Sequence, residues 1–151
     1  MRQIKFRGKD AEDKSNTRWY YGSYFKHLPY TPAPIRDKPI PEEDYQHMMV
    51  IDGFSDWQMP RGIRAVDIIP ETVGEYTGIH DKNGHEIYEG DLLAHDDNHE
   101  FMWEVSYSDG GFNLVGIGLP AEVSAVLNVT VAKDMVVIGN IHDNPEMVSH
   151  E

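Results

Sequence analysis

The sequence predicts a mainly β fold, at the margin of α+β, built from antiparallel hairpins with one or two short helices. Two glycine-bearing corners, Asn83-Gly84 and Asp109-Gly110, each lie between segments rich in β-branched and aromatic residues. Such corners between apolar runs are the strongest local indication of a β-hairpin. A third observation is that a helical pattern is clear only over residues 120–128. Strands are therefore expected to dominate the fold.

The chain has 151 residues and a formal net charge of −13. A chain of this length buries one core, so we expect a single domain over 1–151, with an N-terminal β region over 1–69 and a second region over 70–151. The excess of carboxylates repels a phosphate backbone, so direct nucleic-acid binding is not expected.

The sequence contains no cysteine, which excludes disulfides, thiolate nucleophiles and Cys-ligated metal sites. No apolar run approaches the roughly twenty residues that span a bilayer, and the N-terminus alternates charge without the apolar core of a signal peptide. We therefore expect a soluble, cytoplasmic protein with no membrane partner.

The N-terminal half has several segments of strand character. Residues 2–7 alternate basic or polar side chains with Ile4 and Phe6, which is the period of a half-buried strand. Further strands are expected at 17–25, 46–51, 63–69 and 72–76.

Three aromatic side chains of segment 17–25 suggest a second interpretation. Trp19, Tyr21 and Tyr24 resemble the stacking platforms of single-strand nucleic-acid binders. The negative charge opposes that function, so packing in a core or an interface is favoured.

Residues 28–44 contain five of the nine prolines. Proline cannot donate to a β-ladder and favours extended loops, so a long surface excursion is expected. A polyproline ligand is the alternative, but no PxxP repeat is flanked by basic residues, and a plain surface loop is favoured.

The central hairpin could form in two registers around DKNG, residues 81–84. A two-residue turn would set Asp81 opposite Glu86, which is penalised because the charges are alike. The alternative is a type I turn opened by Asp81, with Gly84 in the left-handed region and Asp81 opposite His85. We favour this second register, in which apolar residues also face each other.

A tight turn is expected directly after this hairpin, at residues 89–91. Gly90 supplies the backbone freedom, and a strand is expected to begin near Asp91. The Asp91 carboxylate is expected to accept backbone N–H groups of the turn.

A second hairpin is expected over residues 102–117. A two-residue turn at its Asp-Gly corner pairs Tyr107 with Phe112 and Val105 with Leu114, which makes one face apolar.

Three elements are expected toward the C-terminus. Residues 120–128 begin with a proline and place apolar side chains at helical spacing, which predicts a short helix. Residues 135–141 form a nearly continuous apolar run, which predicts a strand buried on both faces. Asn144-Pro145 is expected to begin a final turn of helix or loop.

Three segments together resemble the YopX family of phage and prophage proteins: MRQIKFRGKD, EYTGIHDKNGHEIYEGD and VVIGNIHDNPEM. Residues 26–66 show little of the resemblance, and Gly8-Lys9 departs from the usual pattern. The resemblance implies a β-rich fold, a small SH3-like barrel within 70–151, and an origin in a phage or integrated element. It brings no catalytic residues, so no catalytic, cofactor-binding or metal-binding residue is assigned, and no cofactor is expected.

Residues 95–100 are the cluster most similar to a metal site. Two imidazoles and three carboxylates occur within six residues, and divalent ions accept such ligands. The segment lacks helical spacing and the spacing of a calcium loop, so a solvated hairpin loop is favoured. His80, His85 and His142 could approach the cluster in three dimensions. The cluster residues are His95, Asp96, Asp97, Asn98, His99 and Glu100.

Acid–base catalysis would need carboxylates held in a cleft with shifted pKa values. The candidates lie at turns and strand ends, where structural roles explain them. They are Glu75, Asp81, Glu86, Glu89 and Asp91. Ser106 and Ser108 lack the flanking glycines of a hydrolase nucleophile elbow.

The preferred hypothesis is a non-enzymatic protein-interaction module whose partner is a host or phage protein. Two alternatives are a metal-dependent hydrolase or nuclease that uses residues 95–100, and an acidic mimic of nucleic acid that acts on a host protein. Self-assembly into a homo-oligomer is a further alternative, since three tryptophans and eight tyrosines exceed the needs of one small core.

Overall fold

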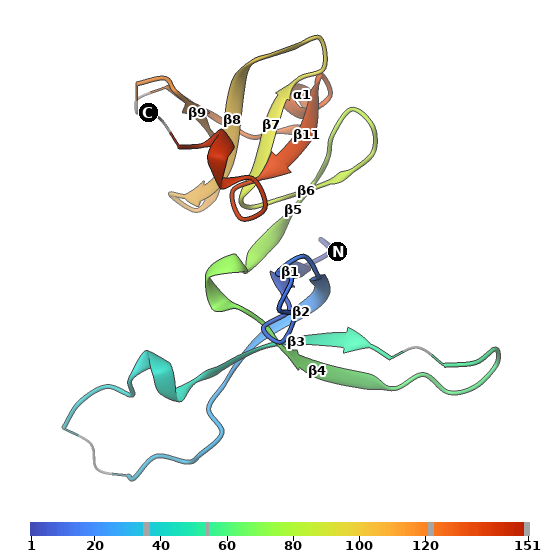
Figure 1. Cartoon of the computed structure of the whole chain (residues 1–151), viewed down its shortest axis with the longest axis vertical. Coiled ribbons are helices and arrows are strands. Elements are labelled where there is room, and N and C mark those ends of the chain that lie inside the picture. Colours follow the sequence, from blue (N-terminus) through green and yellow to red (C-terminus); the bar gives the residue numbers. More distant parts are fainter. Residues whose placement is uncertain (35–36, 54, 121–122, 150–151) are drawn as a thin grey trace. The chain divides into compact units, whose positions relative to one another are not determined.

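The computed structural model describes residues 1–34, 37–53, 55–120 and 123–149 and shows a mainly antiparallel β protein, as the sequence predicts (Figure 1). The chain divides into two units. The N-terminal unit consists of residues 5–73, and the C-terminal unit consists of residues 1–4 and 74–151. Among the described residues, no helix is long and apolar enough to cross a membrane.

The N-terminal unit is an antiparallel sheet in the order β4-β3-β2-β1. Its strands are β1 (Phe6–Lys9), β2 (Trp19–His27), β3 (Gln46–Asp52) and β4 (Ile63–Asp67). Two turns of 3-10 helix accompany them, η1 (Glu42–Asp44) and η2 (Pro70–Thr72). The central strand β3 carries the fully buried Met49, which lies opposite Tyr24 of β2 and Val66 of β4.

Three predicted strand starts are wrong. β2 begins at Trp19, two residues later than predicted. The first strand begins at Phe6 and continues through Lys9, and Ile4 lies outside it and is 62% exposed. Gly8 fits there because a Cβ would lie 2.8 Å from the Cδ1 of Ile68. The segment 72–76 begins as the end of η2, and its strand starts only at Gly74.

The aromatic residues of β2 do not form one platform. Strand residues alternate between faces, so Trp19 and Tyr21 lie on one face and Tyr24 on the other. The Arg7 guanidinium lies 4.7 Å from the ring centroid of Trp19. It therefore covers a face of the Trp19 ring on which a base would have to stack. Packing, the favoured interpretation, fits this arrangement.

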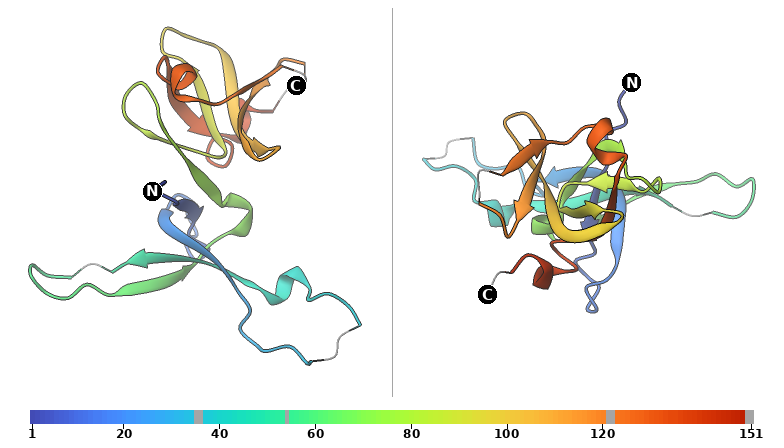
Figure 2. Two further views of the ribbon diagram at one scale, coloured as in Figure 1. Left: turned by 180° about the vertical axis from the view of Figure 1, so that it is seen from behind. Right: turned by 90° about the horizontal axis from the view of Figure 1, so that it is seen from above.

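Two excursions extend from this sheet, and the two views in Figure 2 show that they run in different directions. The first connects β2 with β3 and spans residues 28–45, and we call it the proline arm. The second is the end of the β3–β4 hairpin, residues 52–63, and we call it the hairpin arm. The proline arm is the surface excursion that the sequence predicts, with η1 near its end.

The C-terminal unit contains a hairpin and a five-stranded antiparallel sheet in the order β10-β9-β8-β7-β11. The hairpin strands are β5 (Gly74–His80) and β6 (Glu86–Tyr88). The sheet strands are β7 (Asp91–His95), β8 (Asn98–Ser108), β9 (Gly111–Ile117), β10 (Ser124–Val126) and β11 (Met135–Asn140). A short helix α1 (Val129–Ala132) precedes β11, and η3 (Pro145–Met147) follows it.

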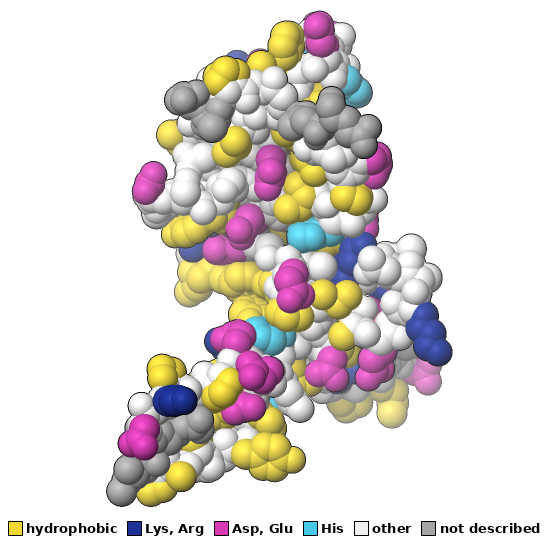
Figure 3. Space-filling view, turned by 60° about the vertical axis from the view of Figure 1, so that its left-hand side comes forward, with side chains coloured by type: hydrophobic (Ala, Val, Ile, Leu, Met, Phe, Trp, Pro, Cys, Tyr) yellow, Lys and Arg dark blue, Asp and Glu magenta, His cyan; other side chains and the backbone are white. Residues whose placement is uncertain are grey.

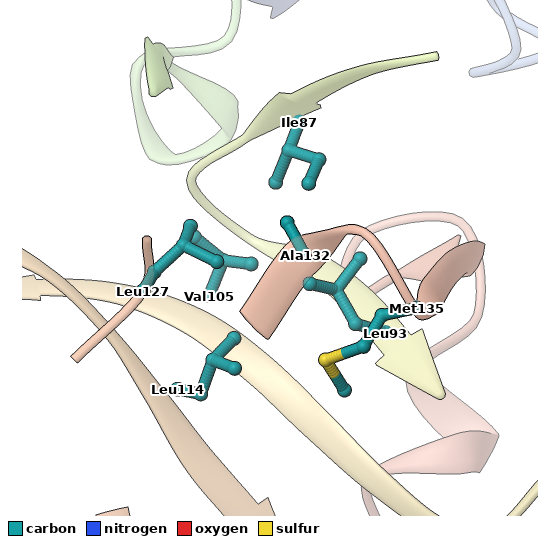
Figure 4. Close-up of a cluster of buried hydrophobic side chains, with 7 residues drawn as sticks. All are labelled: Ile87, Leu93, Val105, Leu114, Leu127, Ala132 and Met135. Carbon is teal, nitrogen blue, oxygen red and sulfur yellow. The ribbon is translucent and has the colours of Figure 1, made fainter. Parts of the chain in front are cut away.

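The core of this unit is a single apolar cluster to which the hairpin, the sheet and α1 all contribute (Figure 4). Trp103 and Phe112 pack against it from the flanks. Its fully buried members are Ile87, Leu93, Val105, Leu114, Leu127, Ala132 and Met135. Burying side chains of this size contributes about 1.5–3 kcal/mol for each large residue, so this cluster dominates the stability of the unit.

The β8–β9 hairpin confirms its predicted register. Tyr107 lies opposite Phe112, and Val105 lies opposite Leu114. The turn residue Gly110 has φ +80°, the left-handed conformation that a two-residue hairpin turn requires. The rings of Tyr107 and Phe112 meet edge to face with centroids 5.2 Å apart.

The helix predicted over 120–128 is wrong. Ser124–Val126 form β10, which pairs with β9 and extends the sheet. An extended backbone lets Leu127 reach the core, and the Asn128 side chain then accepts a hydrogen bond from the Val131 N–H at 3.0 Å and caps α1. The start of the predicted helix, residues 121–122, lies outside the described residues.

The predicted C-terminal strand and final turn both form. Met135–Asn140 are a strand whose first two residues, Met135 and Val136, are buried. Residues 137–139 are only half-buried, so the predicted burial on both faces holds only at its start. Asn144-Pro145 begins η3.

The turn of the β8–β9 hairpin generates a matched prediction. A Cβ at Gly110 or at Gly111 would meet no atom within 4 Å, but only Gly110 has a positive φ. Gly110→Ala should therefore lower the free energy of unfolding by about 1 kcal/mol through backbone strain alone. Gly111→Ala, the control, should leave it nearly unchanged.

Urea unfolding of protein labelled with 5-fluorotryptophan checks this, because the Trp103 fluorine resonance reports this unit separately from Trp19 and Trp57. Equal losses in the two variants would show that the turn is not held in the left-handed conformation.

Candidate functional site

The Asp81 carboxylate, a candidate acid or base, is fully buried and holds backbone N–H groups. Its Oδ1 accepts hydrogen bonds from the N–H of Asn83 at 2.8 Å and of His85 at 2.9 Å. Its Oδ2 accepts one from the N–H of Val137 at 3.0 Å, which joins the β5–β6 turn to β11. Gly84 has φ +83°, and the N–H of Asp81 donates to the His85 carbonyl, so the favoured register of this turn is confirmed.

Burial and hydrogen bonding act on the pKa of Asp81 in opposite directions. Desolvation raises the pKa, but the N–H groups of Val137, His85 and Asn83 together outweigh it, so the pKa lies below its usual value. A carboxylate held ionised by three backbone donors is a poor proton carrier at neutral pH. Asp81 therefore serves structure.

Asp91 has a similar function in the following turn. It is buried, and its Oδ2 accepts the Tyr88 N–H at 2.8 Å. Gly90 has φ +89° and donates its N–H to the Val105 carbonyl at 2.8 Å. The predicted capping role and the strand start at Asp91 are both confirmed.

Asn140 organises the last motif of the chain. Its Oδ1 accepts the N–H groups of His142 and Asp143, and its Nδ2 donates to the Asp143 carboxylate at 2.9 Å. The Ile141 N–H donates to the Gly90 carbonyl at 2.9 Å, so this motif is joined to the turn of Asp91. The two most distinctive motifs of the sequence thus form one framework.

The segment 95–100 is a tight hairpin and only partly a loop. β7 ends at His95 and β8 begins at Asn98, so the turn proper is Asp96-Asp97. The Asp96 carboxylate pairs with the Lys82 ammonium at 2.5 Å. Among the described residues, no three or more His, Cys, Asp or Glu side chains are arranged to hold a metal ion.

Two of the three histidines named as potential neighbours of this hairpin contact other residues. His85 lies against Asp81, with Nδ1 3.4 Å from Oδ2, and His80 lies against the Tyr76 hydroxyl at 3.4 Å. The Glu75 carboxylate pairs with the Arg2 guanidinium at 3.5 Å. The Tyr88 hydroxyl donates to the Glu86 carboxylate at 3.3 Å.

Two further carboxyl groups have raised pKa values. Burial raises the pKa of Glu89, helped by the nearby Glu75 carboxylate, and burial alone raises the pKa of Glu104. Glu104 lies on β8 opposite Leu92 and Val115, with apolar neighbours on both adjoining strands. Sheet packing explains its shift.

The N-terminal unit contains a polar network that local sequence patterns do not indicate. The Tyr24 hydroxyl lies 2.5 Å from Nδ1 of His47, and Nε2 of His47 lies 3.3 Å from the Glu42 carboxylate. The same carboxylate accepts a hydrogen bond from the Lys26 ammonium at 2.7 Å, and that ammonium lies 4.2 Å from the ring centroid of Tyr45. Because β2 pairs with β3 and η1 folds back, residues distant in sequence meet here.

The network anchors the proline arm. Burial raises the pKa of Tyr24, so its hydroxyl stays protonated and is not an activated nucleophile. Glu42 opens η1 at the end of the arm, and its bonds to β2 and β3 fix that end against the sheet. The sequence would indicate this network only if the register of β2 against β3, which sets Lys26 opposite His47, were known.

The two arms carry open clefts and exposed apolar side chains. The cleft of the proline arm has a volume of about 430 Å³, and that of the hairpin arm about 440 Å³. The three most exposed large apolar side chains described in the N-terminal unit lie on these arms: Trp57 at 97%, Tyr30 at 82% and Ile63 at 76%.

The chain belongs to the YopX protein family, whose model matches residues 5–149. No curated protein matches it. The crystal structure of protein EF1440 from Enterococcus faecalis is similar, with a TM-score of 0.54 and 23% sequence identity over 99% of this chain and 100% of that one. This likeness concerns the fold alone and confirms its mainly β character.

The lowered pKa of Asp81 leads to a prediction that its contribution to stability depends on pH. A folded-state pKa below the unfolded value stabilises the fold above the unfolded pKa, and this contribution is lost as pH falls through the folded pKa. Asp81→Asn should lower the free energy of unfolding by about 2 kcal/mol at pH 7 and by less below about pH 4.

Urea unfolding monitored at the Trp103 fluorine resonance measures this difference across pH. Asp97→Asn, which neutralises an exposed carboxylate of the same unit, is the control and should change little. A deficit for Asp81→Asn that stays constant down to pH 2 would contradict the assignment.

The hairpin at 95–100 gives a prediction about metal ions. Its side chains do not converge, so calorimetric titration with zinc or manganese chloride should give no saturable heat. A saturable heat that His95→Ala/His99→Ala removes would restore the metal-dependent hydrolase or nuclease as the better interpretation.

Proposed function

We propose that the protein is a non-enzymatic interaction module of phage or prophage origin that acts in the cytoplasm and docks a host or phage protein through its two arms. The observation that carries the proposal is the exposure of Trp57, Tyr30 and Ile63 on those arms. Large aromatic side chains exposed on a soluble surface are the usual anchors of protein interfaces.

The hairpin arm is built to present Trp57. β3 and β4 pair up to Asp52 and Ile63, and the Gly53 N–H donates to the Gly62 carbonyl at 2.7 Å, so the base of the arm is held by the ladder. Trp57 and Met59 line the cleft at its tip. The ladder fixes the base of the arm, so less backbone freedom is lost when the exposed Trp57 docks, which favours affinity.

The distribution of carboxylates supports this proposal over the alternatives. Asp81 and Asp91 are occupied by backbone N–H groups, which leaves them no catalytic task. On the face shown in Figure 3, acidic side chains are interspersed with hydrophobic and uncharged ones. A mimic of nucleic acid needs a continuous acidic surface, so this pattern gives that alternative no support.

Trp57 provides the test. The protein and its Trp57→Ala variant are immobilised and exposed to lysate of the organism that encodes them, at several salt concentrations. The wild type should retain one protein, and the Trp57→Ala variant should retain at least tenfold less of it. Removing an aromatic anchor costs about 2 kcal/mol or more of binding free energy.

Phe101→Ala is the matched control, since it truncates an exposed aromatic residue of the C-terminal unit and should leave retention unchanged. If no protein is retained, or if both variants lose it equally, the arms are not the docking surface.

A further inference from the structure

The cleft of the proline arm combines aromatic and acidic walls. One wall comes from the outgoing limb, residues 28–32, with the exposed Tyr30. The other comes from the returning limb and includes Glu43, Asp44 and Tyr45. Two tyrosines and two acidic residues therefore line one open volume of about 430 Å³.

The charge of this cleft is unbalanced. The described residues that line it include no lysine or arginine, while Glu43 and Asp44 are exposed carboxylates in η1. Figure 3 shows hydrophobic, acidic and basic side chains on this arm, and the basic residue of the arm that the structure describes, Lys38, is not among the residues that line the cleft. A negatively charged ligand would be repelled, and a purely apolar one would leave the carboxylates without partners.

The protein already holds a cation in the same manner beside the cleft. The Lys26 ammonium lies 4.2 Å from the ring centroid of Tyr45 and 2.7 Å from the Glu42 carboxylate. The Glu42 carboxylate and the Lys26 ammonium neutralise each other there, but Glu43 and Asp44, the next two residues, have no such basic partner among the cleft residues. An aromatic face beside a carboxylate is the usual environment of a bound lysine or arginine.

We propose that this cleft binds a lysine or arginine side chain from a basic segment of the partner protein. The proposal rests on the proposed function and names the chemistry of its partner. Tyr30 receives the aliphatic stem and the face of the cation, and Glu43 and Asp44 pair with its charge. Tyr45, whose ring already lies against the Lys26 ammonium, forms part of the returning wall. The anchoring network of Tyr24, His47 and Glu42 holds the returning wall in place for this contact.

The test uses the whole protein and a defined peptide. ¹⁵N-labelled protein is titrated with acetyl-Gly-Arg-Lys-Arg-Gly-amide, and with a neutral peptide that carries citrulline and norleucine at the basic positions. The basic peptide should give saturable amide shifts concentrated at residues 28–32 and 43–46, and the neutral peptide should give none.

Charge-matched variants localise the binding. Glu43→Gln/Asp44→Asn should weaken binding of the basic peptide about three- to tenfold. This is the combined effect expected for the loss of two exposed ion pairs. Asp67→Asn/Glu71→Gln makes the same change in net charge at exposed positions of the N-terminal unit outside both arms, and it should weaken peptide binding less than twofold. Tyr30→Ala removes an exposed aromatic side chain of the cleft and leaves η1 intact. It should weaken binding of the basic peptide by a factor similar to that of Glu43→Gln/Asp44→Asn.

Several results would overturn the inference: no saturable shifts, equal weakening by both double variants, or shifts spread over the surface. Tighter binding of spermidine than of the peptide would assign the cleft to free polyamines and would also overturn it. If the peptide fails but capture of a partner still depends on Trp57, the inference about the cleft falls and the proposed function stands.

Discussion

The C-terminal unit depends on the buried carboxylate of Asp81. It accepts backbone N–H groups from its own turn and from Val137 of β11, a strand that follows 56 residues later. The Lys82 N–H donates to the Met135 carbonyl at 2.9 Å beside it, so the turn is fixed to β11 at two points. Without this carboxylate, three part-buried N–H donors would lose their acceptor, at a cost of about 1 kcal/mol each.

Groups that resemble catalytic machinery in the sequence are therefore used to build a scaffold. Asp81, Asp91 and Asn140 each satisfy backbone groups at turns, and the segments in which the sequence resembles the YopX family contain all three. The two arms, residues 28–45 and 52–63, lie outside those segments.

Local chemistry explains which features could be predicted. The turns at DKNG and at Asp109-Gly110 depend on residues within five positions of each other, and their registers followed from charge and backbone conformation. The segment 124–126 has a helical pattern yet pairs with β9, because tertiary contacts override weak propensity. The network of Tyr24, His47 and Glu42 could not be predicted, because it needs the register of β2 against β3 and the fold of η1.

The central claim is that an ionised Asp81 carboxylate, held by backbone donors, joins the β5–β6 turn to β11. The most direct test is a pH titration of the Asp81 side-chain carboxyl carbon by ¹³C NMR on the whole protein. The account predicts a midpoint below the value of about 3.9 for an unperturbed aspartate, with the Val137 amide shift changing at the same pH. A midpoint at or above that value, or a Val137 amide that does not respond, would contradict it.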